Sequence, residues 1–191
     1  MSRPVNPPAV TMLIETKRLT LRSVEPGDAG FLADLFNSAD LLDSDAPYKL
    51  VYPLSKEMEE EWISRAVGRS DEAHMIVEMR KDRSPIGIVS VNDIDGRNAS
   101  AALRIRLKEE SWDRGYGTEA VRETARFMFD RMNIRRVWLR VDEENARAIR
   151  CYEKCGFVLE GVLREDHVRG GAWKNSLVMS LLHGDLKEGG R

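Results

Sequence analysis

Alternating apolar and polar positions predict seven strands along the chain. The clearest case is Leu103-Arg104-Ile105-Arg106-Leu107, in which apolar and basic residues alternate with the period of two that a half-buried strand requires. The turn residues Asp82-Arg83-Ser84-Pro85 separate two apolar stretches, which we therefore expect to form a hairpin. The two hairpin strands and the other stretches of strand character cover residues 18–22, 75–79, 86–91, 137–141, 157–163 and 172–182.

A period of about 3.6 residues predicts four helices. The first follows a turn at 25–28, and the longest follows Gly117. Ser55 can cap another through its hydroxyl, and the last runs from Asn145 to Gly156, which is its C-terminal stop. The apolar side chains that we expect on inner helix faces are Phe31, Leu32, Leu35 and Phe36, then Met58, Trp62 and Ile63, then Val121, Ala125, Met128 and Met132.

The order of these elements predicts one α/β (α+β) domain with a single mixed sheet of six or seven strands and about four helices. Strand, helix and strand over residues 103–141 form one crossover unit, which should be parallel and right-handed. We expect the domain to cover residues 12–183, between a proline-rich flexible tail at 1–11 and a flexible tail at 184–191. A length of 191 residues fits one domain.

Composition restricts the class of protein. Thirty basic and 32 acidic residues give a net charge of −2, which provides no overall attraction to nucleic acid or to an anionic membrane. No apolar run approaches the roughly 20 residues of a membrane helix, and the first residues lack the apolar segment of a secretory signal. The two cysteines, Cys151 and Cys155, lie one helical turn apart, but the three histidines lack ligand spacing. We therefore expect no metal site and a cytoplasmic location.

A glycine loop precedes the longest helix. Its sequence is Trp112-Asp113-Arg114-Gly115-Tyr116-Gly117-Thr118. The glycines let a ligand approach the backbone, and the first N–H groups of the helix, which have no intrahelical partner, lie at the positive end of its dipole. This combination favours phosphate. Two alternatives remain: Gly115-x-Gly117-x-x-Ala120 also fits a dinucleotide fingerprint, and the glycines could form only a tight turn.

Three segments together resemble the GCN5-related N-acetyltransferases (GNAT). They are the loop from Trp112 to Ala120, the segment Val141-Asp142-Glu143-Glu144-Asn145, and Tyr152-Glu153-Lys154-Cys155-Gly156-Phe157. Their order and spacing make the resemblance specific, and it covers residues 12–182. Within the superfamily, the chain is most similar to the RimJ/RimL-type branch, which is named for ribosomal-protein alanine acetyltransferases.

The resemblance implies an enzyme that transfers an acetyl group from acetyl-coenzyme A to a primary amine by direct attack in a ternary complex. It implies that the loop N–H groups bind the cofactor pyrophosphate and that a splay between strands 103–107 and 137–141 admits the pantetheine arm. Tyr152 corresponds to the general acid that protonates the coenzyme A thiolate, although spacing alone would make it a core residue. The cofactor-binding residues implied are Ile105, Arg106, Leu107, Trp112, Asp113, Arg114, Gly115, Tyr116, Gly117, Thr118 and Asn145; Asn145 is also expected to cap its helix.

Two positions depart from the family pattern. Trp112 stands where the family loop usually begins with Gln or Arg, but Arg114 can supply charge to a pyrophosphate. Ala102 stands where many relatives carry a glutamate that accepts a proton. Without that carboxylate, the proton acceptor could be a water oriented by Glu78 or Asp93, or the chain could be a non-catalytic protein that binds or senses acetyl-coenzyme A.

The acceptor amine is expected to meet an acidic stretch between the first two helices. Residues 40–45 contain three aspartates, Asp40, Asp43 and Asp45, which would attract a cationic acceptor such as a polyamine, an aminoglycoside or a basic peptide N-terminus. The alternative is that these aspartates cap helices or face water. A homodimer is one candidate assembly.

Overall fold

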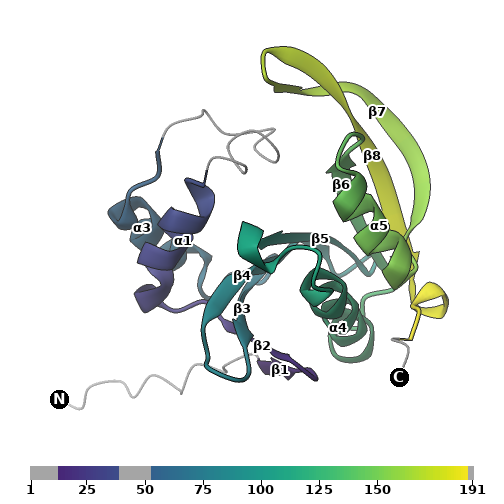
Figure 1. Cartoon of the computed structure of the whole chain (residues 1–191). Coiled ribbons are helices and arrows are strands. Elements are labelled where there is room, and N and C mark those ends of the chain that lie inside the picture. Colours follow the sequence, from purple (N-terminus) through teal and green to yellow (C-terminus); the bar gives the residue numbers. More distant parts are fainter. Residues whose placement is uncertain (1–12, 39–52, 189–191) are drawn as a thin grey trace.

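The structure, a computed structural model, describes residues 13–38 and 53–188 (Figure 1). Its eight strands form one sheet in the order β1-β2-β3-β4-β5-β6-β8-β7. The strands are β1 (Leu13–Glu15), β2 (Leu19–Ser23), β3 (Ala73–Met79), β4 (Pro85–Asp95), β5 (Ser100–Leu107), β6 (Arg136–Asp142), β7 (Val158–Arg169) and β8 (Ala172–Leu182). The helices are α1 (Ala29–Phe36), α3 (Lys56–Ala66), α4 (Tyr116–Arg131) and α5 (Ala146–Cys155). The tail at 1–11 and the acidic stretch at 40–45 lie outside the described residues.

The predicted fold class is confirmed, with one more strand than expected. The additional strand, β1, pairs antiparallel with β2. It has only three residues, too few to establish an alternating pattern. The predicted hairpin of β3 and β4 is also present, with Ile76 opposite Ile88.

Helices cover both faces of the sheet (Figure 1). On one face, α4 and α5 pack against the main core, to which Val89, Leu103 and Leu139 contribute. On the other face, α1 and α3 pack over Ile76 and Ile88 in a second cluster. Since successive strand residues point to opposite faces, His74, Ser90 and Ala102 belong to the face of α1 and α3.

The register of α3 corrects one sequence prediction. Ser55 caps the helix as expected, since its hydroxyl accepts a hydrogen bond from the Met58 N–H at 3.3 Å. Met58 itself is 38% exposed, although we expected it to face the core. Glu59 is buried in its place, whereas Ile63 is buried and Trp62 packs against the second cluster, as predicted. A carboxylate at a buried helical position breaks the apolar period, so the pattern missed Glu59 and assigned Met58 to the inner face.

The two central strands separate along their length. β5 and β6 are parallel, and their pairing covers only Ser100 to Ala102 opposite Arg136 to Trp138. Beyond these residues each strand continues to its end without the other, and β6 pairs with β8 on its far side. The predicted splay is therefore confirmed, and its apex lies at Ala102 and Trp138.

Residues 184–188, which the sequence analysis assigned to the C-terminal tail, contact the domain. The Lys187 N–H donates to the Cys155 carbonyl at 3.0 Å, and Leu186 packs against the main core. Gly156 permits this approach: its φ is +107°, and a Cβ there would lie 2.0 Å from the Asp185 carbonyl oxygen. The described part of the tail thus closes over the end of α5.

Candidate active site

The glycine loop lies at the N-terminus of α4, as predicted. Gly115 has a φ of +78° and is the N-cap residue, and Glu119 is the first to donate an α-helical hydrogen bond, to the Gly115 carbonyl. The N–H groups of Tyr116, Gly117 and Thr118 therefore have no acceptor within the helix. A Cβ on Gly117 would lie at van der Waals distance, 3.5 Å, from the Cys151 sulfur, so α4 and α5 are close at this point. The loop has the geometry of an anion site.

Trp112 links the end of β5 to the start of α5. Its indole N–H donates to the Leu107 carbonyl at 2.9 Å, and the Arg147 guanidinium carbon lies 3.2 Å from its ring centroid. This tryptophan occupies the position where the family loop usually begins with a polar residue. Here it fixes the path of the chain from β5 into the loop.

Sequence reasoning missed a clamp beneath the loop. The Arg18 guanidinium donates to the Arg114 carbonyl at 3.0 Å and to Glu119 Oε2 at 2.7 Å, and it lies 4.6 Å from the centroid of the Tyr116 ring. Glu119 also accepts hydrogen bonds from the Thr16 hydroxyl at 2.5 Å and from the Arg18 N–H at 2.8 Å. The sequence signal for this clamp was Glu119 itself, an acidic residue in the first turn of α4.

The charge of Glu119 is favoured by these contacts. Burial raises the pKa of this carboxyl, but the hydrogen bonds from Thr16 and Arg18 outweigh burial and leave the pKa below its ordinary value. Glu119 is therefore ionised at neutral pH and holds Arg18 against the loop.

Tyr152 lies on α5, faces the main core and is 6% exposed. Its ring is 5.7 Å from that of Phe157. Tyr152 belongs to the same core cluster as Leu139, the β6 residue that follows the last pair with β5. The expected cap is confirmed, since Asn145 Oδ1 accepts from the Ala148 N–H at 3.0 Å.

Two thiols join α5 to the glycine loop. The Thr118 hydroxyl donates to the Cys151 sulfur at 3.4 Å, and the Cys155 thiol donates to the Thr118 carbonyl at 3.4 Å. Hydrogen bonding to Cys155 outweighs burial and lowers the pKa of Cys151 to about 7. The same hydrogen bond and burial raise the pKa of Cys155. These contacts place Tyr152 and the loop on one rigid unit.

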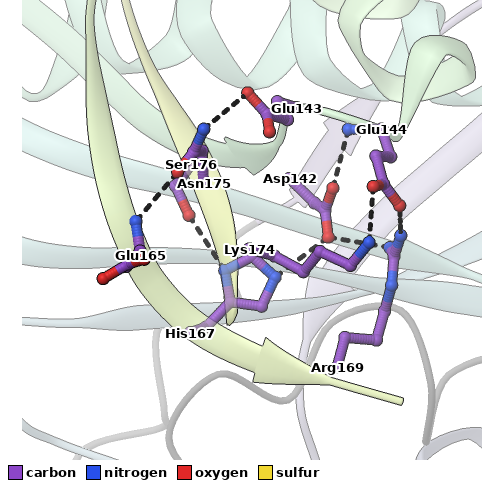
Figure 2. A network of polar contacts seen from close by, with 9 residues as sticks. All are labelled: Asp142, Glu143, Glu144, Glu165, His167, Arg169, Lys174, Asn175 and Ser176. Carbon is purple, nitrogen blue, oxygen red and sulfur yellow. Dashed lines mark hydrogen bonds and ion pairs between the residues drawn. The ribbon is translucent and has the colours of Figure 1, made fainter. Parts of the chain in front are cut away.

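A polar network fixes the far end of β6 to the β7–β8 hairpin (Figure 2). Asp142 Oδ2 lies 2.9 Å from His167 Nε2 and 2.7 Å from Arg169 Nη1. His167 Nδ1 lies 3.3 Å from the Ser176 hydroxyl, and Glu144 accepts from Arg169 and Lys174. The residues come from three strands and the turn before α5. The network therefore fixes the hairpin beside the opening of the splay.

The two candidate carboxylates for orienting a water have different positions. Glu78 is buried and accepts from Arg22 at 2.7 Å, and its strand position is opposite Pro85, beyond the row that contains Leu107. That row lies five residues from Ala102, or about 16 Å of strand, so Glu78 is far from the apex. Asp93 follows Asn92 in a bulge of β4, with a φ of +52°, and Asn92 is directly opposite Ala102. Of the two, only Asp93 lies near the apex.

Comparison with known proteins identifies the fold and its chemistry. Residues 18–158 match the family model described as Acetyltransferase (GNAT) domain. The chain belongs to the GNAT acetyltransferase family. It is therefore an N-acetyltransferase that uses acetyl-coenzyme A, which rules out the dinucleotide-binding interpretation. That the glycines bind the cofactor stays a prediction.

The relatives include spermidine acetyltransferases. The chain is 28% identical to spermidine N(1)-acetyltransferase of Vibrio cholerae over 167 residues, which are 86% of this chain and 93% of the relative. It is 26% identical to the Escherichia coli K12 spermidine N(1)-acetyltransferase, over 84% of each chain. The crystal structure of the Vibrio cholerae enzyme in complex with CoA and spermine superimposes with a TM-score of 0.80, covering 89% of this chain and 98% of that one, at 27% identity.

These names do not support the RimJ/RimL-type branch. The segments that carried the resemblance lie between residues 112 and 157, within the part of the chain that matches the general GNAT model. Within residues 13–38 and 53–188, no helix is long and apolar enough to cross a membrane, and no group of three or more His, Cys, Asp or Glu side chains could hold a metal.

Proposed function

We propose that this GNAT enzyme acetylates a primary amine of a cationic polyamine such as spermidine. The observation that carries the proposal is the likeness to the Vibrio cholerae spermidine acetyltransferase, whose structure contains CoA and spermine and whose chain is covered almost completely. The predicted attraction of a cationic acceptor by Asp40, Asp43 and Asp45 agrees with this substrate class. Those aspartates lie outside the described residues, so their role stays a prediction.

The cofactor is assigned to the splay and the glycine loop. We propose that the pyrophosphate accepts hydrogen bonds from the N–H groups of the loop, with charge from Arg114. From there the pantetheine arm runs along the edge of β5 that β6 leaves open. Four residues separate Leu107 from Leu103, which gives the arm about 13 Å of strand edge. The remaining contacts in this assignment are Ile105, Arg106, Trp112, Asp113, Tyr116 and Asn145.

The acid step is assigned to Tyr152. The amine nitrogen attacks the thioester carbon, the new C–N bond gives a tetrahedral intermediate, and the C–S bond then breaks. Tyr152 donates its phenolic proton to the departing thiolate and recovers a proton from the nitrogen through solvent. Its place on α5, in the core cluster that contains Leu139, supports this role.

Two further properties belong to the same proposal. The edge strand β7 and its neighbour expose apolar side chains, including Val158, Val162 and Trp173, which supports a homodimer through this ribbon. Cys151 and Cys155 are free thiols, which is typical of the reducing cytoplasm. A net charge of −2 supports small-molecule acceptors over nucleic acid.

An acceptor panel tests the function. The purified chain is incubated with acetyl-coenzyme A and spermidine, spermine, an aminoglycoside or a peptide with an N-terminal alanine, and free thiol is measured. We expect kcat/KM for spermidine to exceed that for the peptide by at least about tenfold, or about 1.4 kcal/mol of transition-state binding. If free thiol were released only with the peptide, the acceptor would be a protein N-terminus and not a polyamine. Binding of acetyl-coenzyme A without release for any amine would indicate a sensor.

A further inference from the structure

An amine acceptor presents this enzyme with a protonated nitrogen. An alkyl ammonium has a pKa near 10.4, so at neutral pH it must lose a proton before its lone pair can attack the thioester. At the apex of the splay, position 102 is an alanine and offers no acceptor for that proton. Another group near the apex has to take it.

A line of three polar side chains crosses the sheet beside this point. Ser90 Oγ lies 2.9 Å from His74 Nδ1, and His74 Nε2 lies 3.4 Å from Glu72 Oε2. In the neutral imidazole that carries its proton on Nε2, Nδ1 can accept the serine proton, and Nε2 lies within ion-pair distance of the Glu72 carboxylate without a hydrogen bond to it. The three groups therefore have the order hydroxyl, imidazole, carboxylate. Such an order can move a proton away from whatever contacts the hydroxyl.

Strand register places Ser90 one strand away from the splay and two residues from the row of its apex. Ser90 on β4 is opposite His74 on β3 and opposite Arg104 on β5. Asn92, two residues further along β4, is opposite Ala102, which is the last β5 residue paired with β6. Both β4 side chains lie on the face of α1 and α3. Tyr152 lies on the other face, in the core cluster that contains Leu139, so a thioester in the splay would have the proposed acid on one face of the sheet and the serine on the other.

The surroundings of the imidazole keep it neutral. The His74 side chain is only 7% exposed, and the Trp62 ring lies 4.7 Å from it. Burial lowers the pKa of His74 below its usual value, and this effect exceeds the opposing influence of Glu72. A neutral imidazole at pH 7 can accept a proton, and the adjacent carboxylate stabilises the imidazolium that results.

The charged and polar groups around the line are few among the described residues. Glu72 is also contacted by Arg69 Nε at 2.9 Å and by Asn92 Nδ2 at 3.5 Å. The other groups on the elements packed here are Asp71, which pairs with Arg69, Glu59 on the inner face of α3, Arg104 on β5, Arg22 on β2 and Asp93 in the bulge of β4. The ion pair with Arg69 holds the Glu72 carboxylate in place beside His74.

We propose that Ser90, His74 and Glu72 form the proton-accepting relay of this acetyltransferase. The ammonium donates one proton to Ser90 Oγ as the serine proton moves to His74 Nδ1, and the free amine then attacks the thioester carbon. His74 afterwards returns its proton to solvent, so the one proton that the overall reaction releases leaves by this route. Ser90 contacts the acceptor, while Glu72 positions and stabilises His74. The relay rests on the amine acetylation proposed above and not on the acceptor being a polyamine.

The relay predicts a specific pH dependence. Changing His74→Gln should lower kcat at pH 7 by about 10²- to 10⁴-fold and leave the affinity for acetyl-coenzyme A unchanged. In the parent, kcat should fall as the pH drops below the pKa of His74, and the variant should lose this acidic limb. The deficit of the variant should shrink as the pH approaches 10, because there the acceptor is already deprotonated. If His74 had only a structural role, the variant would keep the acidic limb of the parent, and its kcat would be lower than that of the parent by the same factor at every pH.

A second variant tests the position of the relay. Ala102 is opposite Asn92, whose amide contacts Glu72, so Ala102→Glu places a carboxylate beside the same point. Added to His74→Gln, it should restore at least about tenfold of kcat, with a new acidic limb near the ordinary pKa of a glutamate, about 4.3. Ser90→Ala leaves the imidazole intact and should lower kcat at pH 7 as much as His74→Gln does. It provides the test if the histidine variant does not fold.

The controls separate the relay from the function itself. His183→Gln removes an exposed histidine whose nearest acidic group is Asp130, 3.7 Å away, and it should keep parental rates. A parent that acetylates no amine would overturn the proposed function and the relay together. A parent that acetylates spermidine, with His74→Gln and Ser90→Ala both folded and equally fast at pH 7, would overturn the relay alone.

Discussion

The clamp beneath the glycine loop leads to a prediction about Arg18. Its guanidinium makes three contacts: an ion pair with Glu119, a hydrogen bond to the Arg114 carbonyl, and a contact with the face of Tyr116. The Arg18 side chain is 41% exposed, so we assign the ion pair only about 0.5–1 kcal/mol. The hydrogen bond adds about 0.5–1.5 kcal/mol and the cation–π contact about 0.5–1 kcal/mol.

Arg18→Ala should therefore lower the free energy of unfolding by about 1.5–3.5 kcal/mol. For a domain of this size, about 1 kcal/mol shifts Tm by roughly 2–4 °C, so we expect Tm to fall by about 3–14 °C. The loop would also lose the side chain that holds the Arg114 carbonyl. We expect the Kd for acetyl-coenzyme A to rise about tenfold, as the loop must then be ordered on binding.

Lys17→Ala is the matched control. It removes the same charge one residue away, and no contact of the Lys17 side chain is found among the described residues. Scanning calorimetry gives Tm, and isothermal titration calorimetry gives Kd. If general attraction of the cofactor by positive charge were the cause, both variants would bind equally weakly. Equal Tm and equal Kd in the two variants would refute the clamp.

Three other predictions concern the cofactor, the acid and the acceptor, and one concerns stability. Gly117→Val should fold and bind acetyl-coenzyme A at least about tenfold more weakly, since its side chain fills the approach to the backbone; unchanged affinity by calorimetry would remove the loop assignment. Tyr152→Phe should lower kcat by roughly ten- to ten-thousand-fold with little change in cofactor affinity. An unaltered kcat, with chemistry shown to be rate-limiting, would mean that Tyr152 is a core residue and not the acid. Asp43→Asn together with Asp45→Asn should raise KM for spermidine, and added salt should raise KM in the parent. If neither change alters kcat/KM, these aspartates only face water and do not attract the acceptor. The pKa of Glu119 lies below its ordinary value of 4.5, so the ionised carboxylate stabilises the fold above pH 4.5 and this contribution is lost as the pH falls. The Tm difference between the parent and Glu119→Gln should therefore narrow from pH 7 to pH 3.

Local patterns predicted the part of the site that is continuous in sequence. The alternation over residues 103–107, the glycines and the helix after them carry their structure in neighbouring residues, so strand, loop and helix were found where expected. Asn145 and Gly156 likewise cap α5 through contacts of a few residues. The splay followed from the family resemblance, and no pattern in the strands themselves indicates where β5 and β6 separate.

The parts that were missed depend on distant contacts. Arg18 and Glu119 are 101 positions apart, so the clamp is visible only once β2 lies beside the start of α4. His74 looked isolated in the sequence, and the antiparallel register of β3 and β4 brings it against Ser90, 16 positions away. Met58 was misplaced because a buried glutamate follows it.

The central claim is that this GNAT chain transfers acetyl groups to a polyamine, and product analysis tests it most directly. The purified chain is incubated with acetyl-coenzyme A and spermidine, and the mixture is analysed by mass spectrometry alongside a thiol assay. We predict one equivalent of free coenzyme A for each equivalent of N-acetylspermidine, with saturation in both substrates. Tight binding of acetyl-coenzyme A with no acetylated spermidine would contradict the account.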